Sequence, residues 1–137
     1  MTAPCFDVDM TEDMLDQTCP VRTILGHITS KWGVLILIAL KGRTLRFSEL
    51  RRRVGGISER MLSQTLQTLE ADDIVHRKAY DVVPPHVEYS LTQTGDAITD
   101  RLVNLVCWID ENLTAFPSVQ NHRALQSQPP AQTETAS

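Results

Sequence analysis

Apolar residues recur along the first half of the chain at spacings that predict a series of short helices. The longest unbroken apolar run covers residues 34–40, and Ser30, shortly before it, has the side chain of a good helix N-cap. Cys19 and Pro20 open an earlier helix that extends to about Thr29, because proline is favoured in the first helical turn. A helix that is apolar on every face is enclosed by protein, so we expect residues 34–40 to be buried on all sides.

Residues 47–71 hold two short helices joined by a tight turn that contains a glycine pair. The second helix begins at the N-cap residue Ser58. Its apolar stripe lies within about 60° of the helix circumference and consists of Leu62, Leu66 and Leu69. Its other side is polar and consists of Arg60, Gln64 and Gln67, with Ser63 on the flank. A helix divided in this way can rest on a protein body while it offers hydrogen-bonding groups to base edges.

Extended chain is predicted at residues 44–46, 74–80 and 87–91. The last two segments are separated by a stretch that contains Pro84 and Pro85, and two prolines cannot continue a paired ladder. We therefore predict a hairpin with a stiff, extended tip.

The last predicted helix begins at the cap residue Thr92 and ends near Leu113. Its apolar band is wider than a small core would cover, so we expect it to contact a second copy of the chain. Together with Trp32, the expected dimer interface consists of Ile98, Leu102, Leu105, Val106 and Ile109.

The order of these elements is that of a winged helix-turn-helix, a mainly α fold with a small β-hairpin wing. We expect an acidic N-terminal arm at residues 1–18, the winged helix-turn-helix domain at residues 19–116, and a disordered C-terminal tail at residues 117–137. The dimer is expected to form through the N- and C-terminal helices.

The composition changes this picture little. The chain has 137 residues, of which 42% are hydrophobic and 22% charged, as in one globular domain. The longest apolar run is far below the roughly 20 residues of a membrane span, and the acidic N-terminus lacks the basic region of a secretory signal. Three cysteines, an odd number without close pairing, favour a reducing compartment. We therefore expect a cytoplasmic protein.

The charge distribution, in contrast, points to a partner. The chain has a net charge of −4, yet residues 22–60 carry nine basic residues against two acidic ones. A basic segment inside an acidic chain is typical of a phosphate-binding surface, so we predict duplex DNA as the partner. The predicted DNA contacts are Lys41, Arg46, Arg51, Arg52, Arg53, Ser58, Arg60, Ser63, Gln64, Gln67, Lys78 and His86.

Other functional classes fit the sequence less well than DNA binding does. The arginine run at residues 51–53 could be a solvated face, and a winged helix can also serve as a protein–protein adaptor without DNA. The chain has no glycine-rich phosphate loop, no Ser/His/Asp set and no evident carboxylate pair, so we predict no enzyme activity. Its histidines and cysteines lack metal-ligand spacing, so we expect neither a metal nor a cofactor.

Several short blocks of the sequence resemble the HxlR-type family of bacterial regulators, and within it the YtfH-like members. These blocks are Cys19-Pro20, Lys31-Trp32, FSELRR at 47–52, ISERML at 57–62, PPHVEYSLT at 84–92, and Gly95. The resemblance implies a homodimeric DNA-binding transcription factor, which we expect to be a repressor, with wings that grip the minor groove. It also implies sensing of electrophiles, quinones or oxidants through the N-terminal cysteine.

Cys19 is the candidate reactive residue of this sequence. At an N-cap its sulfur faces the positive end of the helix dipole, and Arg22 lies one turn further on; both favour the reactive thiolate. The alternative is a small buried side chain in a regulator that responds to a non-covalent ligand. Cys107 lies opposite the apolar band, where it is either exposed or at a dimer contact, and Cys5 lies in the arm.

Overall fold

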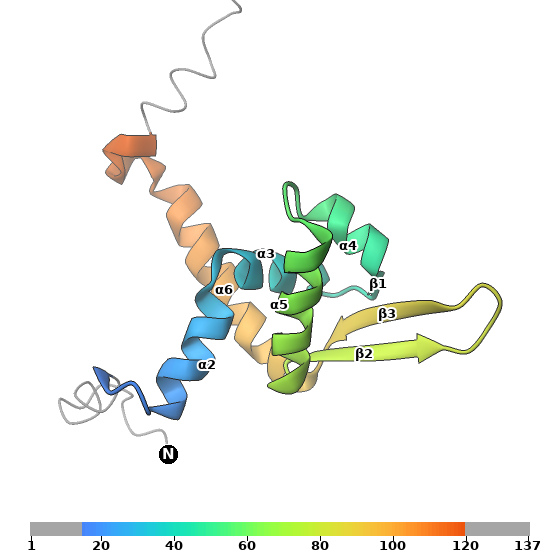
Figure 1. Cartoon of the computed structure of the whole chain (residues 1–137). Helices are drawn as coiled ribbons and strands as arrows, with labels where there is room; N and C mark the ends of the chain where they lie inside the picture. Colours follow the sequence, from blue (N-terminus) through green and yellow to red (C-terminus); the bar gives the residue numbers. More distant parts are fainter. Residues whose placement is uncertain (1–14, 120–137) are drawn as a thin grey trace, which may run out of the picture. The chain divides into compact units, whose positions relative to one another are not determined.

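The computed structural model of the protein describes residues 15–119 (Figure 1). In chain order its elements are α2 (Pro20–Thr29), α3 (Lys31–Leu40), β1 (Leu45–Arg46), α4 (Phe47–Arg53), α5 (Glu59–Ala71), β2 (Val75–Tyr80), β3 (His86–Leu91), α6 (Gln93–Glu111) and the 3₁₀ helix η1 (Leu113–Ala115). They fall into two units, of which the first ends at Leu102 and the second begins at Val103. The predicted arm up to residue 14 and the predicted tail from residue 120 lie outside the described residues.

The first unit is built around α3, which packs against α2, α4, α5 and β3. Its fully buried side chains are almost all aliphatic and include Ile36, Leu37, Leu40, Leu50, Leu62, Leu66, Leu69 and Ile74. The prediction that residues 34–40 are buried on all sides is wrong for Leu35, which is 40% exposed. The four neighbouring elements leave one strip of the helix uncovered, because a small domain cannot surround a helix completely.

The wing is a three-stranded antiparallel sheet in the order β1-β3-β2. The predicted hairpin of β2 and β3 is confirmed, and the short segment β1 adds a third strand, with Leu45 opposite Tyr89. One face of the sheet is buried through Leu45, Val75 and Tyr89. Figure 1 shows the hairpin projecting away from the helices.

Three helix starts have the side-chain caps that the sequence predicts. The Ser30 hydroxyl accepts a hydrogen bond from the Gly33 amide at 3.1 Å, and the Ser58 hydroxyl accepts one from the Met61 amide at 3.1 Å. At the third start, Thr92 Oγ1 accepts a bond from the Gly95 amide at 3.0 Å. These bonds satisfy amides that lack a partner within their own helix.

The start of α6 lies directly on the connection between α5 and β2. The Thr92 amide donates to the Ile74 carbonyl oxygen at 3.1 Å. At Gly95 the two segments approach so closely that an added Cβ would lie 2.0 Å from the same oxygen. Glycine is therefore required at this position by contact between two backbones.

The second unit contains the C-terminal half of α6 and η1. The helix ends at Glu111, two residues earlier than expected, and residues 117–119 of the predicted tail are helical. The exposed large apolar side chains of this second unit are Leu105, Val106, Trp108, Ile109 and Val119.

Over residues 15–119, no single helix has the length and hydropathy of a membrane span. Helices α2 and α3 reach both only when they are taken together, and they are bent by 70° relative to each other.

Candidate nucleic-acid interface

Helix α5 presents two chemically different sides. Leu62, Leu66 and Leu69 are buried in the core, as the helical spacing predicts. On the other side Arg60, Gln64 and Gln67 are exposed, and Ser63 on the flank is half-buried. The side chains of this polar side end in guanidinium, amide and hydroxyl groups, which pair with base edges in the major groove of DNA.

Helix α4, which precedes α5 in the chain, carries three arginines. Arg51, Arg52 and Arg53 are all exposed. Arg51 Nη1 donates to Glu59 Oε1 at 2.7 Å across the turn, so its charge is partly compensated. Arg52 and Arg53 form no ion pair with any other residue between positions 15 and 119. These two guanidinium groups are thus the cations of α4 best able to contact phosphate.

Lys41 has a different environment from the other predicted DNA contacts. Its ammonium group bonds Asp96 Oδ1 at 2.8 Å and also contacts Asp100, both on α6. Hydrogen bonds to the carboxylates of Asp100 and Asp96 raise the pKa of Lys41 above its ordinary value. With two carboxylates beside it, Lys41 holds the end of α3 against α6, and a phosphate would meet a net negative site.

The outer face of the wing carries most of its polar groups. Arg46, Glu88 and Lys78 are adjacent across the three strands, because Glu88 pairs with Arg46 on one side and with Lys78 on the other. Nearer the tip, the rings of Tyr80 and His86 are stacked with 4.6 Å between their centroids. His86 is therefore half-buried, and its Nε2 lies 3.5 Å from Glu88 Oε1.

Two exposed bases on β2 were missed in the sequence, His76 and Arg77. They lie beside Lys78, which was predicted as a DNA contact. The alternating pattern of a strand would place neighbouring side chains on opposite faces, and on that ground Arg77 should face the core. Arg77 is nevertheless exposed, although Tyr89, its partner on β3 and on the same face of the sheet, is buried.

The C-terminal end of α5 is connected to α2 by a polar contact. His27 Nδ1 lies 2.5 Å from Asp72 Oδ2, at the C-cap of α5. Between the same two helices is a groove of about 250 Å³ whose lining includes Met61, Gln64 and Thr65. The polar side of α5 is therefore continuous with this groove.

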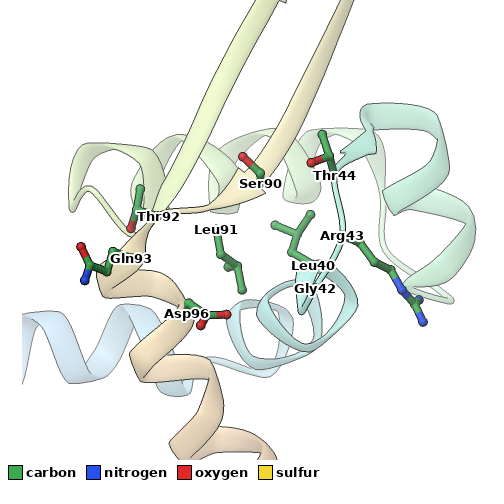
Figure 2. A pocket seen from close by; sticks show the side chains of 9 residues that line it. All are labelled: Leu40, Gly42, Arg43, Thr44, Ser90, Leu91, Thr92, Gln93 and Asp96. Carbon is green, nitrogen blue, oxygen red and sulfur yellow. The ribbon is translucent and has the colours of Figure 1, made fainter.

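A hollow of about 350 Å³ lies at the base of the wing (Figure 2). Leu40 and Leu91 form its apolar centre, and Thr44, Ser90 and Asp96 are among the polar residues around them. Arg43 extends away from the other lining side chains (Figure 2). Among the residues that the structure describes, no group of three or more His, Cys, Asp or Glu side chains could hold a metal ion.

Helix α2 has an apolar, largely exposed face. A groove of about 450 Å³ is lined by apolar side chains alone, namely Pro20, Val21, Ile24, Leu25, Ile28 and Ile98. Cys19 is the half-buried N-cap of α2, as predicted. Arg22 Nη1, which was expected to favour its thiolate, donates to the carbonyl oxygen of Leu15 at 2.8 Å. Cys107 is exposed in the second unit, and Cys5 lies outside the described residues.

The residues predicted for a dimer interface differ in their burial. Leu102, which is predicted for this interface, is 8% exposed and belongs to the core, so little of its side chain is left to contact a second chain. The spacing of apolar residues along a helix does not show which of them pack against the core of the same chain and which remain exposed. Trp32 and Ile98 are half-buried against the core, whereas Leu105, Val106 and Ile109 are exposed.

Comparison with known proteins identifies relatives of this chain. The family model described as HxlR-like helix-turn-helix matches residues 27–116. The chain is 51% identical over 112 residues to the HTH-type transcriptional regulator YtfH of Escherichia coli (strain K12), which covers 82% of this chain and 89% of the relative.

Two solved structures extend that comparison. A putative transcriptional regulator ytfH from Salmonella typhimurium is 51% identical, covers 81% of this chain and 96% of its own, and superposes with a TM-score of 0.70. The redox regulator HypR in its oxidized form is 40% identical, with 68% of this chain and 96% of that chain covered and a TM-score of 0.63.

Proposed function

Because the chain belongs to the HxlR-like helix-turn-helix family and is a transcriptional regulator of that type, we propose that it binds a specific DNA sequence as a homodimer and represses transcription. In this proposal α5 enters the major groove, α4 contacts phosphates, and the wing reaches the adjacent minor groove. The protein would act in the cytoplasm and would catalyse no reaction.

The observation that carries the proposal is the exposed polar side of α5. Arg60, Gln64 and Gln67 project from a helix whose other side is fixed in the core, so their positions are held by the fold. Rigid placement of such groups is what base readout requires. Arg52 and Arg53 on α4, which have no ion-pair partner within residues 15–119, add positive charge suited to phosphates, and this favours DNA over a partner that is only protein.

Gln64→Ala and Arg52→Ala should separate base readout from phosphate contact. Gln64→Ala should weaken binding to the specific site by about 1–3 kcal/mol and leave binding to random DNA almost unchanged. Arg52→Ala should weaken both and lower the slope of log K against log salt by about one. Fluorescence anisotropy titrations at several salt concentrations measure both effects, on a duplex enriched from a random pool by the wild-type protein and on a scrambled duplex.

Arg101→Ala is a matched control for Arg52→Ala. Arg101 is also exposed on a helix, but it lies on α6 and its Nη1 donates to the Ala97 carbonyl oxygen at 2.8 Å. Its removal should leave DNA affinity and salt slope unchanged. Equal effects of Gln64→Ala and Arg52→Ala on random DNA would show that the two roles are assigned wrongly.

The homodimer is supported by apolar surface that each unit leaves exposed. In the first unit, Val21, Ile24 and Leu25 line the apolar groove on α2. In the second unit, Leu105 and Trp108 are more than half exposed. Large exposed apolar patches on small proteins are typical of protein–protein interfaces, and two reading helices in a twofold dimer double the DNA site.

Electrophile sensing through Cys19 is the regulatory part of the proposal. Relatives with similar structures include HypR, named a redox regulator, and YodB of B. subtilis, solved after treatment with diamide. Cys19 is placed at the start of α2, whose apolar face is a proposed dimer contact. A modification there would change the spacing of the two reading helices, and a rigid DNA site would then fit poorly.

Cys19→Ser should make operator binding insensitive to oxidation. Diamide or a quinone is expected to weaken DNA binding by the wild-type protein, with no such loss in Cys19→Ser or Cys19→Ala. Cys107→Ser is the control, because Cys107 is also an available thiol but lies in the second unit. A response to diamide that persists in Cys19→Ser would assign the sensing to Cys107 or Cys5, the other two thiols of the chain.

A further inference from the structure

Helix α2 is fixed to the first unit at one end only. Its buried side chain is Ile28, in the last turn, whereas residues 20–25 are all exposed. Open grooves lie on both sides of the helix, one of about 250 Å³ towards α5 and one of about 450 Å³ that reaches Ile98 on α6. Figure 1 shows the first turns of α2 lying away from α5. Because so little of α2 is packed, its angle to the rest of the unit can change easily.

One polar contact connects the packed end of α2 to α5. His27 Nδ1 lies 2.5 Å from Asp72 Oδ2, and the ring nitrogen is the donor because a carboxylate only accepts hydrogen bonds. The two side chains are 33% and 15% exposed, so water competes for this bond only in part. Between residues 15 and 119, no other hydrogen bond or ion pair connects α2 to α5. Bonds to an ionised carboxylate are among the stronger hydrogen bonds in proteins, so this one restrains α2 against α5.

The carboxylate of this contact is rigidly attached to α5. Asp72 is the C-cap of the helix, and its amide donates to the Thr68 carbonyl oxygen at 3.2 Å. The next residue, Asp73, has a φ of +56°, and its amide closes the last turn on the Glu70 carbonyl oxygen at 2.9 Å. A helix end closed in this way moves with its helix. Any rotation of α2 about its last turn is therefore passed to α5 through Asp72.

We propose that His27 and Asp72 form a positioning pair that sets the angle between α2 and α5, and through it the half-site spacing that the dimer accepts. This inference rests on the proposed DNA-binding homodimer. In that dimer the exposed apolar face of α2 contacts the second copy, so each α2 is attached to the other chain. The distance between the two α5 helices then depends on how each is held on its own α2. Neither His27 nor Asp72 needs to touch DNA for this effect.

The chemistry of the pair explains why it can select one spacing. An apolar contact permits a range of angles between two helices, whereas a hydrogen bond has a preferred distance and direction. On DNA, each base pair added between two half-sites moves them about 3.4 Å apart and turns them by about 35°. A dimer with a fixed angle between α2 and α5 should therefore prefer one spacer length, and a dimer without the contact should accept several.

The test compares spacer lengths with the full chain. A duplex enriched from a random pool by the wild-type protein supplies the two half-sites, and two further duplexes have one base pair more or one fewer between them. In anisotropy titrations the wild-type protein should prefer the enriched spacer about 30-fold. His27→Ala and Asp72→Ala should each reduce this preference to about threefold. The double variant should show no further reduction, because the contact is already lost in each single variant.

Two variants serve as controls. In His27→Asn the side-chain amide nitrogen takes about the place of Nδ1 and can donate to Asp72, so the wild-type preference should be kept. Thr23→Ala should keep it as well, because Thr23 is exposed one turn before His27 and its hydroxyl bonds within α2, to the Cys19 carbonyl oxygen at 3.4 Å. All variants should bind a duplex that contains a single half-site as the wild type does, which shows that α5 itself is intact.

Three outcomes overturn the inference. A spacer preference that is absent from the wild type, or unchanged in His27→Ala and Asp72→Ala, would mean that the pair does not set the spacing, and the proposed function would stand. Weaker binding of these variants to the single half-site would mean that the pair supports α5 itself rather than its angle. If the wild-type protein enriches no duplex from the random pool, the proposed function and this inference both fall.

Discussion

Gly95→Ala is expected to lower the free energy of unfolding by about 3 kcal/mol. The added Cβ would lie 2.0 Å from the carbonyl oxygen of Ile74 and 3.0 Å from its carbonyl carbon. Neither atom can move away as a flexible side chain would, because the same oxygen accepts the Thr92 amide and Ile74 is fully buried. The helix start must therefore shift, and the capping bond from Gly95 to Thr92 is weakened with it.

Urea unfolding followed by circular dichroism measures this loss, with all variants at one protein concentration because dimer stability depends on concentration. Gly26→Ala is the matched control. Gly26 lies inside α2, and a Cβ added there would meet no atom within 4 Å. That variant should gain about 0.5–1 kcal/mol from helix propensity. A loss below about 1 kcal/mol in Gly95→Ala would mean that α6 can move away from Ile74 at little cost.

Leu105→Asp is expected to produce a monomer and to lower affinity for the specific site at least about 100-fold. Leu105 is 56% exposed in the second unit, so the protomer should fold normally with aspartate in its place. In the proposed interface, however, the carboxylate would lose its hydration without a partner. A monomer contacts only one half-site, and the contribution of the second half-site to affinity is lost.

Cys107→Asp adds the same charge two residues later. Cys107 is exposed and lies about 160° around the helix from the middle of the apolar band, so this variant should remain dimeric. Light scattering gives the oligomeric state, and anisotropy titrations give the affinity of the same samples. A Leu105→Asp protein that is still dimeric would exclude this face from the interface, and a monomeric wild type at micromolar concentration would exclude the dimer itself.

The helices of the first unit and the two sides of α5 were predictable because they depend on local chemistry. Ser30, Ser58 and Thr92 cap the helices that they were predicted to cap, since an oxygen at the N-cap needs only the amides of the next turn. The exposed polar side of α5 follows from helical periodicity alone, once Leu62 and Leu66 are assigned to the core.

Features that depend on distant parts of the chain could not be predicted in this way. Lys41 looked like one more phosphate contact in a basic segment, yet its partners Asp96 and Asp100 lie more than 50 positions further along the chain. The burial of Leu102 likewise depends on how α6 meets the first unit, which its own sequence pattern does not contain. The pairing of β1 with β3 closes a loop of about forty residues, and nothing within β1 specifies it.

The two tryptophans are intrinsic fluorescent reporters, one in each unit. Trp32 packs against the core beside the turn between α4 and α5, where a Cβ added at Gly56 would lie 3.9 Å from its Cη2 atom. Trp108 is 53% exposed and lies in the other unit. The emission of Trp32 therefore responds to the environment of the helix-turn-helix, and that of Trp108 to whatever covers the end of α6. With one indole replaced by phenylalanine at a time, the environments of the two indoles can be followed separately without any attached dye.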